Sequence, residues 1–466
     1  MVECLQHPCI SAFYTEVSMS YLAAVDQLNA MVPELYTGSG QPRRKFSLGE
    51  FRILLGALGN PHMKSRSVLI AGTNGKGSTA ATLASILVAS GLRTGLYTSP
   101  HLTRPNERIC LNGEEIGDDT FAELYFRVRA AAEELICDGR LPQLPSYFEI
   151  LTAQAFIYFA ETKAEIAVLE VGMGGRLDAT NVVNPLISVI TDISLDHTEW
   201  LGPTLGAITR EKAGILRADG VLVTLPQEPE VDQVLRGMVR ELGVRLIDAS
   251  LYLPAEKPEE LGVYAVPGLG RLVEVSSPLP GPHQQRNVAL AVASAIEIGL
   301  SCTLPVTAAS IENGIRQTHW PGRLERLEKH GVAWTLDVAH NPAGALALRA
   351  GLKGMFGHKR FQTLIFSCLR DKPVMELGEI LFPLFEKVIV APLSSVRAAS
   401  MDDLVAAATA AGTSAIVAAS VEDAMKLAIQ GVQDTGEVRG SIVVSGSVYL
   451  VGEVRRRLMN ETGVQA

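Results

Sequence analysis

The sequence predicts an α/β protein in two parts: a P-loop-type domain on a parallel sheet, followed by a smaller Rossmann-like α/β domain. Short apolar runs alternate with stretches of helical length, which is typical of parallel strands covered by helices on both faces. A glycine-rich turn follows the first apolar run and leads directly into a helix. The alternation stops near Trp320-Pro321-Gly322 and then restarts, which predicts a second sheet.

The first part of the chain holds a series of apolar runs that we expect to be strands, with helices between them. These strands are expected at residues 67–71, 93–97, 166–171, 186–190 and 221–225. Helices are expected within 20–60 (interrupted at 37–44), at 79–90, 121–136 and 148–162, near residue 208 and at 287–298. Between residues 249 and 282, short segments punctuated by Pro and Gly predict an antiparallel excursion.

The second part repeats the alternation over a shorter stretch. Strands and helices are expected at 333–337, 343–352, 361–367, 377–384, 387–391, 401–410, 421–429 and 441–444. We therefore divide the chain into an N-terminal extension at residues 1–20, a first domain at 21–317 and a second at 318–466. The ligand cleft is expected between the two domains.

Composition excludes several classes of protein. Hydrophobic residues make up 47% of the 466 residues and charged ones 20%, as in an ordinary globular chain. Acidic residues outnumber basic ones 50 to 41, which argues against a nucleic-acid-binding protein. No apolar run reaches the roughly 18 residues of a membrane helix. The six cysteines form no Cys-x-x-Cys pair and the N-terminus lacks signal-peptide features, so we expect a cytoplasmic protein with reduced thiols.

The glycine-rich turn predicts a nucleotide-binding phosphate loop. It contains Gly72, Thr73, Asn74, Gly75, Lys76, Gly77, Ser78 and Thr79. The glycines let backbone N–H groups approach an oxyanion, while the helix N-terminus and the lysine add positive charge. The loop departs from G-x-x-x-x-G-K-[ST], because its leading glycine is too close and Gly77 separates Lys76 from Ser78. This departure disfavours ordinary kinases and GTPases.

Polar residues after other strands are candidates for a metal site. Glu170 ends an apolar strand beside a glycine turn, where α/β proteins bind ligands, and its oxygens suit Mg²⁺. Asp196-His197 holds the same place after its own strand. Ser99 is either a metal ligand or an ordinary turn serine, and Lys212 by itself is typical of a plain helix lysine.

The second domain offers an anion-binding set at one loop. Asp337 closes a strand and precedes His340-Asn341, at a helix start suited to anions. Arg323 lies at the domain boundary, and its guanidinium fits bidentate phosphate contact. Ser447 follows another strand, and each of these residues alone could equally be structural.

Together these pieces resemble the folylpolyglutamate synthase/dihydrofolate synthase family within the Mur ligase superfamily. The matching stretches occur in family order at 71–78 (AGTNGKGS), 97–109, 170–181 (EVGMGGRLDATN), 194–215, 320–325 (WPGRLE), 337–342 (DVAHNP) and 445–455. Val338 departs from the family's glycine, and Arg370 precedes the family's Asp371-Lys372 pair.

The resemblance implies ATP-dependent addition of L-glutamate to dihydropteroate, to a folate, or to both. A carboxylate of the acceptor attacks the γ-phosphate of ATP, and the amine of glutamate then displaces phosphate from the acyl phosphate. The implied partners are these small molecules, with neither nucleic acid nor membrane, and we expect a monomer. Two magnesium ions are the implied cofactors.

The resemblance also assigns roles to residues. Lys76 and the loop amides hold phosphates, while Asn287, Arg323 and Asp337 match nucleotide contacts. The implied magnesium ligands are Ser99, Glu170, His197 and Lys212, the last as a carbamate formed with carbon dioxide, and Lys76, Lys212 and His340 are the implied catalytic residues. Substrate contacts are implied for Arg104, Phe148, Glu149, His340 and Ser447.

Two other functions remain open from the sequence. A Mur-type ligase acting on UDP-muramyl peptides would share the fold and chemistry, although Gly77 and the SPHL segment at 99–102 argue against it. A nucleotide-binding protein without ligase activity would share the phosphate loop. Turnover that depends on a pterin acceptor distinguishes all three.

Overall fold

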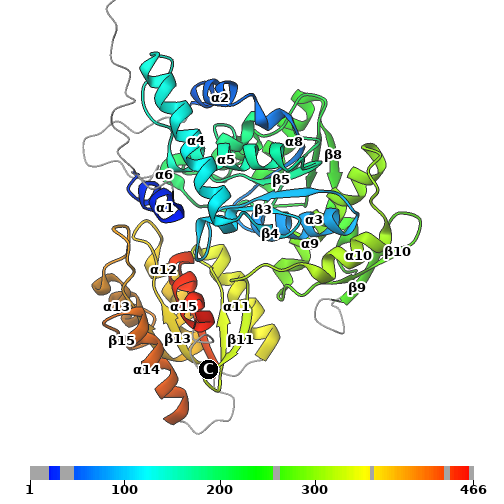
Figure 1. Ribbon diagram of the computed structural model, residues 1–466. Coiled ribbons are helices and arrows are strands. Elements are labelled where there is room, and N and C mark those ends of the chain that lie inside the picture. Colours follow the sequence, from blue (N-terminus) through cyan, green and yellow to red (C-terminus); the bar gives the residue numbers. More distant parts are fainter. Residues whose placement is uncertain (1–19, 32–46, 256–262, 357–360, 435–440, 461–466) are drawn as a thin grey trace, which may run out of the picture.

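The structure is a computed structural model that describes residues 20–31, 47–255, 263–356, 361–434 and 441–460 (Figure 1). Of the expected N-terminal extension, Ser20 alone is described, and its side chain caps the first helix, α1 (Tyr21–Asn29). The interruption expected at 37–44 lies outside the described residues. No described helix is long and apolar enough to span a membrane.

The first sheet has eight strands in the order β4-β3-β2-β5-β1-β6-β7-β8. The strands are β1 (Arg66–Ala71), β2 (Thr94–Tyr97), β3 (Ile109–Leu111), β4 (Glu114–Glu115), β5 (Ile166–Glu170), β6 (Ile187–Ile190), β7 (Val221–Thr224) and β8 (Arg245–Asp248). Six of them are parallel, which confirms the predicted parallel sheet, although β8 was not among the expected strands, and β3 and β4 form an antiparallel edge. Asn112 and Gly113 between them have φ of 52° and 87°, which closes a tight hairpin turn.

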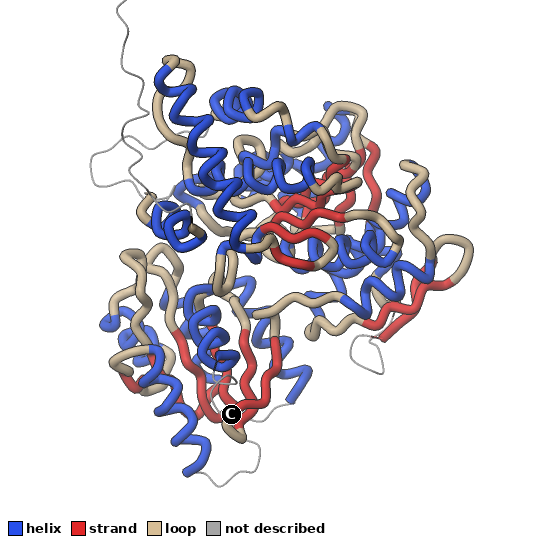
Figure 2. The backbone as a smooth tube through the Cα atoms, viewed as in Figure 1, coloured by secondary structure: helices blue, strands red, loops and turns tan. Residues whose placement is uncertain are grey.

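Helices cover both faces of this sheet (Figures 1 and 2). In β1, Val68 and Ile70 belong to the buried cluster packed on α3 (Lys76–Ala89), α9 (Pro282–Ser301) and α10 (Ala308–Gln317). Leu69 and Ala71 belong to the opposite cluster, on the side of α2 (Leu48–Ala57), α4 (Asp118–Cys137) and α5 (Tyr147–Glu161). Alternate residues are thus buried on opposite faces, which explains the continuous apolar run. The remaining helices of this part are α6 (Thr198–Leu201), α7 (Leu205–Ala213) and α8 (Pro229–Leu242).

The antiparallel excursion expected between residues 249 and 282 is confirmed. It is the two-stranded sheet of β9 (Val263–Pro267) and β10 (Leu272–Ser276). Val273 and Val275 of β10 pack into the buried cluster that also contains residues of α9 and α10. The hairpin therefore extends the core on one side of the main sheet.

The second sheet has six strands in the order β11-β12-β16-β13-β14-β15. They are β11 (Glu325–Lys329), β12 (Val332–Leu336), β13 (Phe361–Phe366), β14 (Phe385–Val390), β15 (Ala415–Val417) and β16 (Ser441–Ser445). All pairs are parallel except β11–β12. Its helices are α11 (Pro342–Phe356), α12 (Val374–Leu381), α13 (Met401–Ala410), α14 (Val421–Asp434) and α15 (Val448–Asn460). The expected boundary at residue 318 lies in the connection between α10 and β11.

Candidate active site

The phosphate loop runs from β1 into α3, and close approaches explain its glycines. A Cβ at Gly72 would lie 1.8 Å from Thr191 Oγ1, and one at Gly75 would lie 2.1 Å from Asn287 Oδ1. Gly75 also has φ of 88°, a conformation that favours glycine. A Cβ at Gly77 would lie 2.8 Å from the ring of Trp320. Asn287 and Trp320 therefore lie directly against the loop, on the side where the sequence predicts the nucleotide.

The loop leaves several polar groups without protein partners, as a ligand site requires. Within the described part of the chain, the buried hydroxyls of Ser78 and Thr79 and the buried Nε1 of Trp320 have no hydrogen-bond partner. The first N–H groups of α3 have no intrahelical acceptor, as at any helix start. Unpaired donors at a helix N-terminus form an anion site, so these groups fit the phosphates of a nucleoside triphosphate.

Two lysines converge on one carbonyl oxygen of the loop. Lys76 Nζ donates to the carbonyl oxygens of Gly72 and Thr73 at 3.1 Å each, and Lys212 Nζ donates to that of Gly72 at 2.7 Å. Burial, together with the neighbouring charge of Lys76, lowers the pKa of Lys212 to about 7. Lys212 is thus not the plain helix lysine that its sequence context alone predicts, because it is buried and its burial favours the neutral amine.

Glu170 is a buried carboxylate at the end of β5, and it lies beside Ser99. It is 4% exposed, and one of its oxygens accepts a hydrogen bond from the Ser99 N–H at 3.0 Å. Burial raises the pKa of Glu170, while the positive charges of Lys76, Arg323 and Arg108 oppose that rise. No three His, Cys, Asp or Glu side chains cluster as a metal site among the described residues. A cation here would therefore need oxygen ligands from other groups, such as a serine hydroxyl or a bound phosphate.

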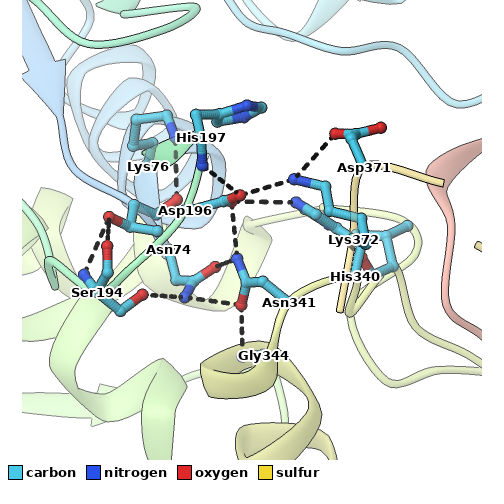
Figure 3. A network of polar contacts seen from close by, with 12 residues as sticks. Asn74, Lys76, Ser194, Asp196, His197, His340, Asn341, Gly344, Asp371 and Lys372 are labelled. Carbon is cyan, nitrogen blue, oxygen red and sulfur yellow. Dashed lines mark hydrogen bonds and ion pairs between the residues drawn. The ribbon is translucent and has the colours of Figure 1, made fainter. Parts of the chain in front are cut away.

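Asp196 connects the two sheets at the seam between them (Figure 3). Its carboxylate accepts hydrogen bonds from Lys372 Nζ at 2.7 Å and from Asn341 Nδ2 at 3.1 Å, and His340 Nε2 lies 3.9 Å away. Asn341 also exchanges amide hydrogen bonds with Asn74 of the phosphate loop, at 3.0 and 3.3 Å. The second domain is thus hydrogen-bonded directly to the phosphate loop.

The charges at this seam are strongly coupled. Burial acts to raise the pKa of Asp196, but positive charge at His197 and Lys372 holds it well below its usual range. Burial lowers the pKa of His197 to about 4, with Lys372 and Lys212 adding to the effect. Because His197 is neutral near pH 7, Lys372 is the effective cation beside Asp196 at that pH.

Arg323 and Asp337 are the nucleotide contacts predicted in the second domain, and their charges act on each other. Both carboxylate oxygens of Asp337 accept backbone hydrogen bonds at 2.9 Å, from Leu324 and Ala339. Burial raises the pKa of Asp337 and lowers that of Arg323, and each group opposes the shift of the other. Val338 is 4% exposed and donates its N–H to the Gly322 carbonyl oxygen at 3.1 Å, so valine fits this strand end.

The predicted substrate contacts fall into two groups. Phe148 lies against the turn after β5, where a Cβ at Gly172 would be 2.6 Å from its ring. Glu149 is the N3 residue of a capping box on α5, and Arg104 forms ion pairs with Asp118 and Glu115 at 42% side-chain exposure. The structure gives both of these residues structural partners. Ser447, at the start of α15, is buried and accepts a hydrogen bond from the Tyr449 N–H.

Sequence reasoning missed several groups that build the site. The carbonyl oxygen of Asp192 accepts hydrogen bonds from the N–H groups of Thr73 and Asn74 and so anchors the loop. The bond between Asp196 and Lys372 was also missed, although both lie in motifs that the sequence singled out. Neither motif contains a local signal that they pair.

Comparison with known proteins defines the class. The middle domain of Mur ligases matches residues 70–295, and the glutamate ligase domain of Mur ligases matches residues 322–448. Fold and site are thus those of a Mur-type, ATP-dependent ligase that joins an acid to an amino acid.

Individual relatives narrow the class to one family. The folylpolyglutamate synthase of Lacticaseibacillus casei is 35% identical over 415 residues, covering 87% of this chain and 93% of the relative. A Mycobacterium tuberculosis folylpolyglutamate synthase complexed with ADP has a TM-score of 0.85 at 33% identity, covering 94% and 98% of the two chains. Escherichia coli FolC in complex with DHPP and ADP has a TM-score of 0.80 at 28% identity, covering 95% and 99%. The chain belongs to the folylpolyglutamate synthase/dihydrofolate synthase family, as the motifs predicted.

Proposed function

We propose that the protein is an ATP-dependent ligase that adds L-glutamate to dihydropteroate, to a folate, or to both, by way of an acyl phosphate. One observation carries this function: the phosphate loop, on which Lys76 and Lys212 converge, is hydrogen-bonded through Asn74 to Asn341 of the second domain, and Asp196 beside it pairs with Asn341 and Lys372. A ligase that binds three substrates needs such a joint site. Family membership favours this function over a UDP-muramyl ligase.

In the first step, an oxygen of the acceptor carboxylate attacks the γ-phosphorus of ATP, and the bond to the bridging oxygen of ADP breaks. Lys76 and the N–H groups at the start of α3 hold the phosphates in line with the attacking oxygen. Arg323 adds charge from the second domain. The residues therefore act through positioning and charge stabilisation.

In the second step, the amine of glutamate attacks the acyl carbon, phosphate leaves, and the amine loses a proton. His340 suits the acceptance of that proton at Nε2. Its Nδ1 lies 2.9 Å from the Val338 carbonyl oxygen and so carries the ring hydrogen, which leaves the lone pair on Nε2, the nitrogen that lies 3.9 Å from Asp196. Burial lowers the pKa of His340, which keeps the ring neutral. Ser447 is proposed to contact the incoming glutamate.

We further propose two Mg²⁺ sites. Ser99, Glu170 and His197 would hold one ion, and a carbamate on Lys212 would contribute to the second. The buried, poorly solvated carboxylate of Glu170 and the unpartnered Ser78 hydroxyl fit an oxygen-preferring cation. When bound, magnesium neutralises charge that develops on the transferred phosphate. Carbon dioxide reacts with a neutral amine, and burial favours this form of Lys212 by lowering its pKa to about 7.

The function is tested by phosphate release with dihydropteroate and tetrahydrofolate assayed side by side. Release should require acceptor, ATP, magnesium and glutamate together, and the ratio of the two rates gives the acceptor preference. Glu170→Gln should abolish release, whereas Arg127→Gln, on an exposed ion pair of α4, should not change it. Turnover without any pterin acceptor would contradict the proposal. We also propose a cytoplasmic monomer, which sedimentation of the purified protein and cell fractionation test.

A further inference from the structure

Arg108 is a buried cation that forms no salt bridge within the described residues, although its charge acts on the buried carboxylate of Glu170. It ends the short 3-10 turn Pro105–Arg108 and is 8% exposed. Its Nε donates to Nδ1 of His101 at 2.9 Å, and its guanidinium lies 5.3 Å from the ring centre of Tyr147. A histidine nitrogen that accepts a hydrogen bond belongs to a neutral ring. Buried arginines are almost always paired with an anion, so this arrangement demands an explanation.

The terminal nitrogens of Arg108 are the unused part of this side chain. Within the described residues, neither nitrogen has a hydrogen-bond partner. Neither is among the fully buried polar atoms that lack a partner, so both remain accessible to a small polar group. By comparison, Arg455 is 18% exposed and pairs with Glu325 at 3.0 Å. Because His101 occupies Nε alone, the fork of terminal N–H groups that fits a carboxylate remains available.

Arg108 lies on the wall of the active site, as contacts among three segments show. The segment after β2 carries Ser99, bonded to Glu170, and two residues later His101, bonded to Arg108. The start of α5 carries Tyr147 under Arg108, and its next residue, Phe148, packs on the turn that follows Glu170. The three segments therefore enclose one corner of the site, beside Glu170 and next to two aromatic rings.

The same segment reaches the second domain. A Cβ at Gly452 of α15 would lie 1.9 Å from the carbonyl oxygen of Leu102, and one at Gly322 would lie 3.2 Å from the Leu102 side chain. The corner that holds Arg108 is thus at the seam where the substrates must meet, and not on a remote surface.

The proposed reaction needs a cation at this corner. It brings a carboxylate anion against the polyanionic γ-phosphate, and their repulsion must be offset locally. Lys76 is bonded to the phosphate loop, Arg323 faces Asp337, and Lys372 is bonded to Asp196. Arg108 is 8% exposed, both of its terminal nitrogens lack a hydrogen-bond partner within the described residues, and its charge acts on Glu170.

We propose that Arg108 binds the reacting carboxylate of the acceptor through its two terminal nitrogens, with the aromatic part of the acceptor against Tyr147 and Phe148. This inference rests on the proposed function and adds to it the residue that recognises the attacking group. The preferred acceptor is then an aromatic carboxylic acid or its glutamyl extension, and a neutral amide at the same position is discriminated against.

The test measures binding of 7,8-dihydropteroate and of its primary carboxamide to the full-length protein, with magnesium and a non-hydrolysable ATP analogue. The wild type should bind the acid at least about ten-fold more tightly than the amide, as expected for charge-assisted hydrogen bonds. Arg108→Gln should bind the two within about two-fold of each other, and Arg108→Lys should retain an intermediate preference. Arg127→Gln, which changes an exposed arginine of the same domain, should keep the wild-type preference.

The outcomes separate this inference from the function on which it rests. Retention of the full acid preference by Arg108→Gln, or by Arg108→Lys if the first variant does not fold, would overturn the assignment. A raised KM for glutamate with an unchanged acid preference would also overturn it, since Arg108 would then serve the incoming amino acid. If the wild type makes the glutamyl product but binds acid and amide equally, the role of Arg108 is refuted and the proposed function is not. Wild-type protein that neither binds nor glutamylates pterin acids would refute the function itself.

Discussion

Replacing Lys212 by methionine should remove a pH dependence from the stability of the protein. Lys212 is 5% exposed, and burial lowers its pKa from an ordinary 10.5 to about 7. Above pH 7 the folded state loses this proton while the unfolded state keeps it. Stability therefore rises with pH wherever the unfolded state binds more protons.

The magnitude follows from the two pKa values. Between pH 6 and pH 9 the unfolded lysine stays protonated, while the folded one passes from mostly charged to neutral. Over roughly two of these pH units the unfolded state binds one proton more than the folded state. Each such unit adds about 1.4 kcal/mol, so the unfolding free energy of the wild type should rise by about 3 kcal/mol. Lys212→Met should show no such gain, because its side chain does not titrate.

The assay is urea unfolding in carbon-dioxide-free buffers at pH 6, 7, 8 and 9, with wild type, Lys212→Met and Lys64→Met compared at each pH. Lys64 is exposed, so its replacement controls for loss of a lysine that is not buried. Bicarbonate should then stabilise the wild type further and leave Lys212→Met unaffected, since ligation of the native state adds to its stability. Equal pH slopes in wild type and Lys212→Met would refute the depressed pKa, and no bicarbonate effect would refute the carbamate.

Two further predictions concern the seam and the loop. Asp196→Asn should lower kcat/KM at least ten-fold, because it removes the charge that pairs with Lys372. A double-mutant cycle with Lys372→Met, measured on kcat/KM, should give a coupling free energy of about 1.5–3 kcal/mol between the two side chains. Additive losses would show that the two side chains act separately. Gly75→Ala should abolish ATP binding measured by calorimetry, because its Cβ would collide with Asn287, whereas Gly91→Ala, also at positive φ but in open space, should bind ATP normally. Equal ATP affinity in both glycine variants would contradict the collision.

The main strands were predictable because burial on both faces leaves a local mark. Val68 and Leu69 point to opposite clusters, so β1 appears as one apolar run. The antiparallel edge was not predicted, since β3 and β4 are three and two residues long and show no period. Asn112-Gly113 was the available signal, as this pair is typical of tight hairpins. The three-residue β15 escaped prediction for the same reason, within an alanine-rich stretch.

The site was predictable where its chemistry is contiguous in sequence. The phosphate loop and the strand-end carboxylate Glu170 are recognisable from their neighbours alone. Lys212 was singled out by the family resemblance and not by its own neighbours, because its environment comes from burial against Gly72, 140 residues away. The same limit applies to the pairing of Asn74 with Asn341, which are 267 residues apart. A residue's partner across two domains is a property of the packing, and no local pattern encodes it.

Polar pairs cross the seam between the two sheets. Asp196 and Lys372 form its ion pair, and Asn74 and Asn341 form its neutral amide pair. When the domains separate, water can solvate all four groups, so the lost hydrogen bonds are largely replaced. The seam is not purely polar, because Leu102 of the first domain packs against the core of the second and lies against Gly322 and Gly452. This apolar contact contributes burial free energy, whereas the polar pairs set the register by holding Asn341 against the phosphate loop.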